Sequence, residues 1–137
     1  MVDRELVQRR LEKLDEYLEI LSRLRRYGYE EFTADPEHYG SAERFLQLSI
    51  EVLSDLGNHV VADQHLGPVA VSADMPRLLA EHGLIPPDLA DLWVRMIGFR
   101  NVLVYEYLEV DRRLVHQVLS ERLGDFARIR SAFGRLM

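Results

Sequence analysis

The chain is 137 residues long, with 47% hydrophobic and 29% charged residues, which predicts a single soluble globular domain over residues 1–137. It contains no cysteine, so disulfides, thiolate nucleophiles and thiolate metal sites are excluded. The formal net charge of −6 argues against general coating of nucleic acid, which requires a basic surface, but is compatible with contact to RNA at a small site.

Hydrophobic spacing predicts helices from the start of the chain. In Asp3–Tyr27, leucines recur at alternating intervals of four and three residues, which is the stripe of an amphipathic helix. A short polar stretch containing Asp35-Pro36 follows. A second helix is expected over Ser41–Val61, and its apolar face carries Leu46, Ile50, Leu53, Gly57 and Val60.

The second half of the chain predicts three more helices. Asp74–His82 is expected to be a short helix that Gly83 ends, and Pro86-Pro87-Asp88 then begins a helix over Asp88–Val104. That helix is apolar on most of its circumference, so we expect it to be covered on all sides. Asp111 is a good N-cap for a last helix reaching Leu136. The residues expected to face inward there are Leu114, Val118, Phe126, Ile129 and Phe133.

These elements predict an all-α fold, an up-and-down helical bundle of four longer helices plus a short one. No apolar run approaches the roughly 20 residues that span a bilayer, so no membrane contact is expected. The first residues lack the basic and apolar regions of a secretory signal, and a cytoplasmic location is therefore expected.

Residues 100–107 place an arginine, an asparagine and two tyrosines near the end of the apolar helix. On a helical wheel Arg100 lies only about 40° from Met96, on an apolar stripe. A permanently charged guanidinium is rarely left there without a partner or a task. One explanation is an ion pair with a carboxylate on a neighbouring helix, in which case Tyr105 and Tyr107 would be residues at the edge of the core.

The second helix offers Glu51, Asp55 and His59 at successive intervals of four residues. Such spacing suits metal binding or general acid–base chemistry. The three residues lie across the wheel from the apolar face, so a solvated surface is the simplest interpretation. Two alternatives stay open: this face lines a groove and supplies the carboxylate that pairs with Arg100, or the three residues hold a metal in the bundle. No metal or other cofactor is expected.

The chain resembles the HepT-like branch of the HEPN domains over nearly its whole length. The specific part of the resemblance is the segment from Gly98 to Val104 followed by Tyr107. The family motif runs arginine, often asparagine, three further residues, histidine, one residue and tyrosine. The other matching segments are Ala42-Glu43-Arg44, Glu51 through His59, Gly83-Leu84-Ile85-Pro86 and Val110-Asp111.

The resemblance implies a metal-independent ribonuclease and toxin that forms a homodimer, with the motifs of two subunits facing each other. It also implies a small nucleotidyltransferase of the MNT type as the antitoxin, which in some systems adds AMP to the motif tyrosine. Carried over to this chain, Arg100 contacts a phosphate and Asn101 supports it. Tyr107 stands in the place of the modifiable tyrosine.

The chain departs from the family motif at one position, where Tyr105 replaces the histidine. A histidine with a pKa near 6.5 takes and gives a proton near neutral pH, whereas a tyrosine with an ordinary pKa of about 10 is ionised at roughly one part in a thousand at pH 7. Tyrosine is therefore a poor general base, although it can still donate a proton. Reduced or absent ribonuclease activity is the expectation.

Two functions follow from the sequence. The first is the toxin of a HEPN/MNT toxin–antitoxin pair, with ribonuclease ancestry and activity weakened by Tyr105. The second is a non-catalytic helical dimer that binds a nucleotidyltransferase. Positions 100 and 105 project about 140° apart on a helix, so one chain cannot easily aim both at one atom. Two chains facing each other, or a helix that unwinds before Tyr105, would remove this difficulty.

Overall fold

The computed structural model describes residues 3–136, and within this range every regular element is helical, which confirms the all-α prediction. Seven α-helices and one 3₁₀ turn, η1, follow one another along the described chain. Their bounds are α1 Arg4–Leu24, α2 Tyr29–Ala34, α3 Pro36–Asp63, α4 Asp74–Glu81, α5 Pro87–Tyr105, η1 Tyr107–Glu109, α6 Arg112–Glu121 and α7 Leu123–Leu136.

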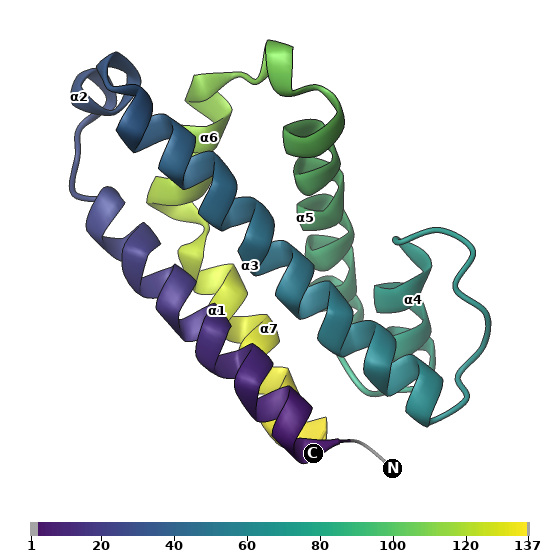
Figure 1. The fold of residues 1–137 in the computed structure, drawn as a ribbon. Coiled ribbons are helices and arrows are strands. Elements are labelled where there is room, and N and C mark those ends of the chain that lie inside the picture. Colours follow the sequence, from purple (N-terminus) through teal and green to yellow (C-terminus); the bar gives the residue numbers. More distant parts are fainter. Residues whose placement is uncertain (1–2, 137) are drawn as a thin grey trace.

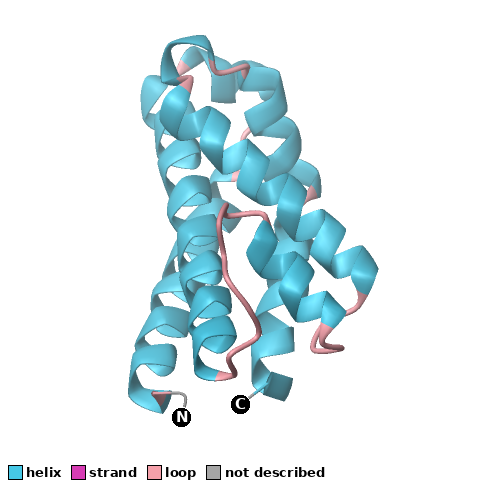
Figure 2. Ribbon diagram, turned by 90° about the vertical axis from the view of Figure 1, so that its right-hand side faces the viewer, coloured by secondary structure: helices cyan, strands magenta, loops and turns pink. Residues whose placement is uncertain are grey.

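The long helices α1, α3 and α5 form the body of the bundle, and α3 lies between the other two (Figure 1). The pair α6 and α7 covers the side of α1 and α3, while α4 covers the later part of α3 and the first part of α5. A long loop over residues 64–73 joins α3 to α4 along the flank of the bundle (Figure 2). The start of α1 and the end of α7 meet at one end of the molecule, opposite η1.

Three aspartates set the starts of helices. Asp3 accepts a hydrogen bond from the Leu6 amide, and Asp111 accepts one from the Arg113 amide, as expected of N-caps. Asp35 does the same for α3, so this helix begins at Pro36 and not at Ser41 as predicted. Proline fits the first turn of a helix because its missing N–H would have had no partner there. The Asp35-Pro36 pair within the polar stretch is therefore the start of α3.

The last predicted helix is divided in two at Arg122, where the backbone leaves the helical conformation. The division changes which face of α6 is buried: Val115 and Leu119 are fully buried, whereas Leu114 is 41% exposed. The prediction that Leu114 faces inward is therefore wrong. In α7, the predicted inward residues Phe126, Ile129 and Phe133 are buried.

The core is centred on α3, which supplies the buried Leu46, Ile50, Leu53 and Val60. At Gly57 a side chain could not fit, because its Cβ would overlap with the Met75 side chain of α4 and touch the Trp93 ring of α5. The missing side chain lets the three helices approach closely. None of the helices within residues 3–136 combines the length and hydropathy that a bilayer-spanning segment requires.

Candidate functional site

Arg100 lies on the face of α5 that meets the middle of α3. Its Nε and Nη2 both donate to Oε1 of Glu51, at 3.1 and 2.9 Å, and its Nη1 donates to Oδ1 of Asn101 at 3.1 Å. Both side chains of the ion pair are half-buried, at 27% exposure for Arg100 and 31% for Glu51. The carboxylate partner predicted for Arg100 is thus Glu51, and a fully solvated surface is the wrong interpretation for this residue.

The network around Arg100 leaves part of the guanidinium unused. A guanidinium carries five N–H donors, and Glu51 and Asn101 engage three of them, so two remain for a bound anion. On the other side of the pair, Gln47 Nε2 donates to the same Oε1 of Glu51 at 3.1 Å. Glu51 is therefore fixed from both α3 and α5, and it orients Arg100 before any ligand arrives.

A polar cavity of about 150 Å³ opens beside this ion pair, between α3, α5 and the loop before α4. Its lining residues are Ile50, Glu51, Ser54, Asp55, Asn58, Ser72, Ile97 and Arg100. Partial burial raises the pKa of the Asp55 carboxyl, and the negative charge of Glu51 raises it further. The positive charges of Arg10 and Arg100 lower this pKa, but the net shift is upward. Ser54 Oγ is buried and has no hydrogen-bond partner among the described residues.

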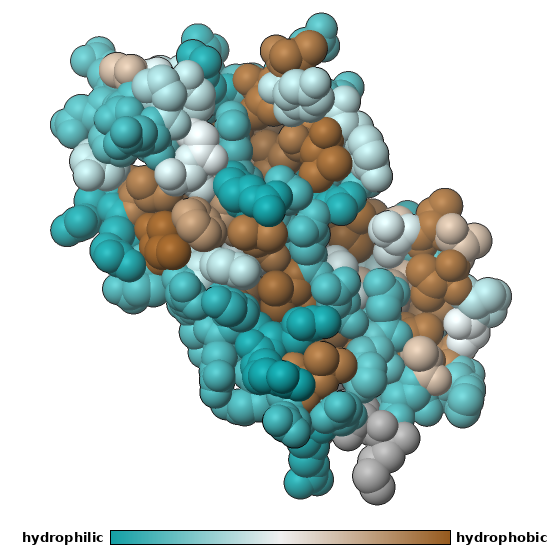
Figure 3. Space-filling view, viewed as in Figure 1, coloured by the Kyte–Doolittle hydropathy of each residue, from teal (hydrophilic) through white to brown (hydrophobic). Residues whose placement is uncertain are grey.

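The structure does not bring the other predicted site residues to this cavity. His59 lies one turn beyond Asp55 on α3, where its Nε2 accepts the Asp3 backbone N–H at 3.3 Å. Tyr105 is the last residue of α5 and is 73% exposed. Tyr107 follows in η1 and is 69% exposed. Neither tyrosine forms a hydrogen bond within residues 3–136. In Figure 3 hydrophobic residues gather on the part of the surface where Figure 1 draws α5.

Glu51, Asp55 and His59 do not combine into a metal site. Within the described part of the chain, no group of three or more histidine, aspartate and glutamate side chains is close enough to hold a metal ion. Glu51 is instead committed to Arg100 and Gln47, and His59 to the start of α1. The structure therefore gives no support to the alternative of a metal-bound bundle.

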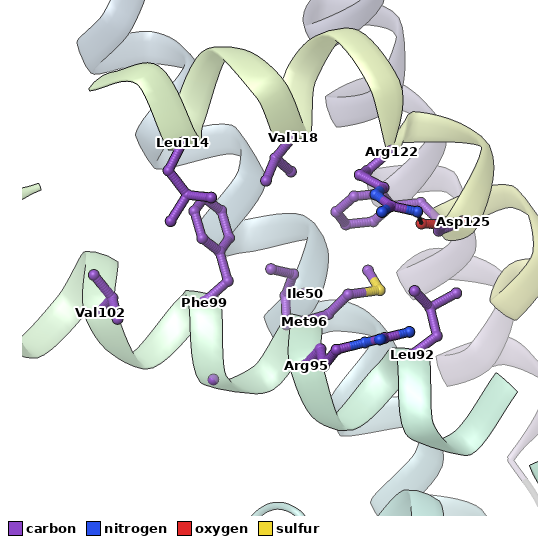
Figure 4. Close-up of a pocket in the computed structure, with 12 residues that line it drawn as sticks. Ile50, Leu92, Arg95, Met96, Phe99, Val102, Leu114, Val118, Arg122 and Asp125 are labelled. Atoms are coloured by element: carbon purple, nitrogen blue, oxygen red, sulfur yellow. Dashed lines mark ion pairs between the residues drawn. The ribbon is translucent and has the colours of Figure 1, made fainter. Parts of the chain in front are cut away.

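A second cavity, of about 390 Å³, lies on the opposite side of α5. It separates α5 from α6, which do not pack against each other, and Figure 4 shows Phe99 on α5 and Leu114 and Val118 on α6 pointing towards one another across it. Its lining is mostly apolar: Ile50, Leu92, Met96, Gly98, Phe99, Val102, Leu114, Val118 and Phe126, with Arg95, Arg122 and Asp125 at one end. This apolar groove means that α5 is not covered on all sides within one chain.

Sequence reasoning missed Ser54, Asn58 and Ser72 as neighbours of Arg100. Ser54 and Asn58 lie on the same side of α3 as Glu51 and Asp55, so helical spacing contained the signal for both. Ser72 comes from the loop before α4, where no periodic pattern places a side chain.

Comparisons with known proteins identify the family of this chain. The family model for HepT-like ribonucleases matches residues 9–133. The mRNA nuclease HepT of Shewanella oneidensis is 37% identical over 81 residues, which are 59% of this chain and 61% of that protein, less than two thirds of its length. The tRNA nuclease HepT of Aphanizomenon flos-aquae is 25% identical over 121 residues, covering 88% of this chain and 82% of the relative.

Solved structures extend the likeness to the fold. A tri-AMPylated Shewanella oneidensis HEPN toxin, in complex with MNT antitoxin, superposes with a TM-score of 0.89 at 25% identity, covering 97% of this chain and 99% of the other. A toxin–antitoxin structure with AMP-PNP also gives 0.89 at 25% identity, covering 96% and 98%. Because the family model spans almost the whole sequence, this chain belongs to the HepT-like ribonuclease family.

Proposed function

We propose that this chain, as one HEPN domain over residues 1–137, is the cytoplasmic toxin of a HEPN/MNT toxin–antitoxin pair and acts on RNA without a metal. Arg100 contacts the phosphate, Asn101 supports Arg100, and Tyr105 stands where the motif histidine is expected. The observation that carries the proposal is the Glu51–Arg100–Asn101 network, which holds a guanidinium in a polar cavity with two donors free.

Metal-free RNA cleavage requires a cation at the phosphate and groups that transfer protons. In metal-free RNA cleavage the ribose 2′-oxygen attacks the adjacent phosphorus and the 5′-oxygen leaves. A proton must therefore leave the 2′-hydroxyl, and another must reach the 5′-oxygen. Arg100 would stabilise the charge on the phosphate through charge-assisted hydrogen bonds. Tyr105 is able to donate a proton but is a weak base near neutral pH, so we expect slow cleavage.

An RNA cleavage assay with the unaltered protein and three variants tests this proposal. Arg100→Ala should lower the rate by roughly 100-fold or more, the range seen when one donor to a transition-state oxyanion is removed. Tyr105→His should raise the rate, by roughly 10- to 100-fold, because histidine accepts a proton at neutral pH. Arg77→Ala, which changes an exposed arginine on α4, is the control and should leave the rate unchanged.

Two results of this assay would contradict the proposal. Cleavage that survives Arg100→Ala would show that the guanidinium is not needed. Brisk cleavage by the unaltered protein, with no gain from Tyr105→His, would show that the replaced histidine is not the limiting group.

The homodimer is the second part of the proposal, and we infer that it forms through α5. The apolar groove supports this, because it leaves an open cavity lined by apolar side chains, Phe99 and Val102 of α5 among them. A two-fold interface would cover the groove and place two motif helices side by side.

The antitoxin partner is the third part, an MNT-type nucleotidyltransferase that adds AMP to Tyr107. Two facts support it: the similar Shewanella toxin is tri-AMPylated and in complex with its MNT antitoxin, and the Tyr107 hydroxyl is exposed and free to react. Incubation with the partner enzyme and ATP should add the mass of AMP to the chain. Tyr107→Phe should abolish the addition, and Tyr105→Phe, which removes a similarly exposed hydroxyl, should not.

A second function, a non-catalytic dimer that binds the nucleotidyltransferase, has one observation in its favour. Tyr105 replaces the histidine and forms no hydrogen bond with Arg100 or any other described residue. If this second function is correct, neither the unaltered protein nor Tyr105→His cleaves RNA, while AMP transfer to Tyr107 continues.

A further inference from the structure

The polar cavity beside Arg100 contains more hydrogen-bonding groups than the Arg100 network uses. Ser54 Oγ is buried without a partner, and the Asp55 carboxylate accepts no hydrogen bond within residues 3–136. Only one carboxylate oxygen of Glu51 accepts hydrogen bonds, because Arg100 and Gln47 both donate to Oε1. A buried polar group is normally satisfied, so the unpartnered Ser54 hydroxyl next to a cation, with the exposed and unpaired Asp55 carboxylate beside it on α3, indicates a ligand.

The shape of the cavity limits what that ligand can be. Its volume of about 150 Å³ is well below the roughly 300 Å³ at which pockets for drug-sized ligands begin, so one planar ring system is the scale that fits. Ile50 and Ile97 give it apolar walls, and the polar groups stand along the α3 side. Apolar faces with a polar edge are the properties of a nucleobase, which stacks through its faces and is recognised along its edge.

The polar groups also select among the bases. An ionised carboxylate only accepts hydrogen bonds, and it pairs best with two parallel N–H donors. Guanine presents two such donors, N1–H and the 2-amino group, along its Watson–Crick edge. Uracil presents there a single donor, N3–H, between two carbonyl oxygens, so it cannot offer two parallel donors, and two carboxylates would repel its oxygens. Asp55 is the carboxylate with both oxygens available, and Glu51, whose Oε2 accepts no hydrogen bond within residues 3–136, lines the same cavity.

We propose that this cavity is a base-recognition subsite that binds guanine next to the phosphate held by Arg100. The inference rests on the proposed function, because it takes RNA to be the ligand of Arg100. Asp55 receives the N1–H and 2-amino donors, Ser54 and Ser72 offer hydroxyls to the remaining polar edge, and the two isoleucines contact the ring faces. Two cations, Arg10 on α1 and Arg100 on α5, offset the negative charges of Asp55 and Glu51.

The test uses dinucleotides that bind but cannot be cleaved, so it does not depend on activity. The 2′-O-methylated GpG, ApA, CpC and UpU are titrated into the full chain, and amide chemical shifts are followed by NMR. We expect GpG to bind roughly 10-fold more tightly than UpU, the size of discrimination that one bidentate contact provides. Asp55→Asn should remove this preference, because an amide cannot offer two acceptors to the same pair of donors.

Two control variants separate the subsite from the phosphate contact. Asp91→Asn, which removes an exposed carboxylate of α5 outside the cavity, should keep the guanine preference. Arg100→Ala should weaken all four dinucleotides to a similar degree, because the phosphate is common to them.

The outcomes distinguish the two proposals. Equal affinity for the four dinucleotides, with Arg100→Ala still weakening all of them, overturns the guanine subsite and leaves the proposed function standing. A preference that survives Asp55→Asn overturns the assigned role of Asp55 and with it the subsite. Failure of all four to bind, together with the absence of RNA cleavage, overturns the proposed function and the subsite with it.

Discussion

Helix α5 separates two cavities of opposite character, and Ile50 of α3 contributes to the lining of both. On one side lies the polar cavity, about 150 Å³, where carboxylates, hydroxyls and Arg100 meet. On the other side lies the apolar groove, about 390 Å³, lined largely by aliphatic and aromatic side chains. The same stretch of α5 thus presents a polar surface on one side and an apolar surface on the other.

The difference between the cavities shows how one helix can serve two kinds of contact. An open apolar groove on a small domain suits a protein surface, because water leaves it at no cost in hydrogen bonds. A small cavity with unsatisfied polar groups suits a ligand that supplies the missing donors. The apolar periphery of α5, predicted to be fully covered, therefore combines a core contact with an open apolar surface, the one proposed for dimerisation.

The largest expected effect comes from breaking the apolar groove. Leu114→Asp places a charge at an exposed position in its lining, so the folded monomer should tolerate it while the dimer does not. We expect dimer dissociation to become at least about 30-fold easier, equivalent to about 2 kcal/mol. Sedimentation velocity over a dilution series measures this. Val71→Asp, at another exposed aliphatic in the loop before α4, should leave the dimer intact. A dimer that survives Leu114→Asp does not use this groove.

The next effect tests how much the Glu51–Arg100 ion pair of the polar cavity contributes to the free energy of unfolding. Glu51→Gln leaves Arg100 half-buried beside a neutral group, and we expect a loss of about 1–2 kcal/mol in the free energy of unfolding, between the values for exposed and buried pairs. Urea denaturation measures it. Asp15→Asn is the matched control, because Asp15 holds Arg130 through two bonds of 2.7 and 2.8 Å but is 53% exposed. Equal losses in both variants would mean that burial does not strengthen the Glu51–Arg100 pair.

A smaller effect distinguishes two serines on α3. Ser49 Oγ donates to the Phe45 carbonyl at 2.7 Å, whereas Ser54 Oγ in the polar cavity has no partner among the described residues. Ser49→Ala should cost about 1 kcal/mol in the free energy of unfolding, and Ser54→Ala should be neutral or stabilising. Thermal unfolding of the two variants under identical conditions gives the comparison. A clear loss from Ser54→Ala would show that this hydroxyl is satisfied, which would weaken the case for a ligand.

The smallest effect concerns pH. Because partial burial raises the pKa of Asp55 in the folded chain, the folded state binds a proton more readily than the unfolded state. This group therefore favours folding at low pH, and the contribution is lost as the pH rises through the raised pKa. Asp55→Asn should stabilise the protein at pH 7, by about 0.5 kcal/mol for a partly solvated group. The gain should shrink as the pH falls towards 4. A gain of the same size at both pH values would contradict this account.

Much of the fold was predictable because hydrophobic spacing is regular over long segments. In α1, Val7, Leu14 and Leu21 recur every seven residues and are all buried, as the pattern predicts. Short elements gave no such signal: α2 buries only Phe32, and six residues are too few for a periodicity. The division at Arg122 was missed because apolar residues continue on both sides of it without a proline.

The site was predictable in its residue types but not in its three-dimensional pairing. Helical spacing placed Arg100 on an apolar stripe and predicted a carboxylate partner on another helix. It could not identify Glu51 among the acidic residues, because a helical wheel gives the direction of a side chain but not the neighbour that it meets. The distinction between Glu51, which faces α5, and His59, which faces the start of α1, depends on how the helices pack.

The meeting of the start of α1 and the end of α7 at the end opposite η1 has a practical consequence. An affinity tag, a fluorophore or a surface tether attached at either end of the described chain stands a bundle length away from Tyr107. The protein can therefore be immobilised by either end while the exposed Tyr107, the tyrosine proposed to receive AMP, stays accessible. Such a geometry makes it suitable for following the arrival of a nucleotidyltransferase on single tethered molecules in real time.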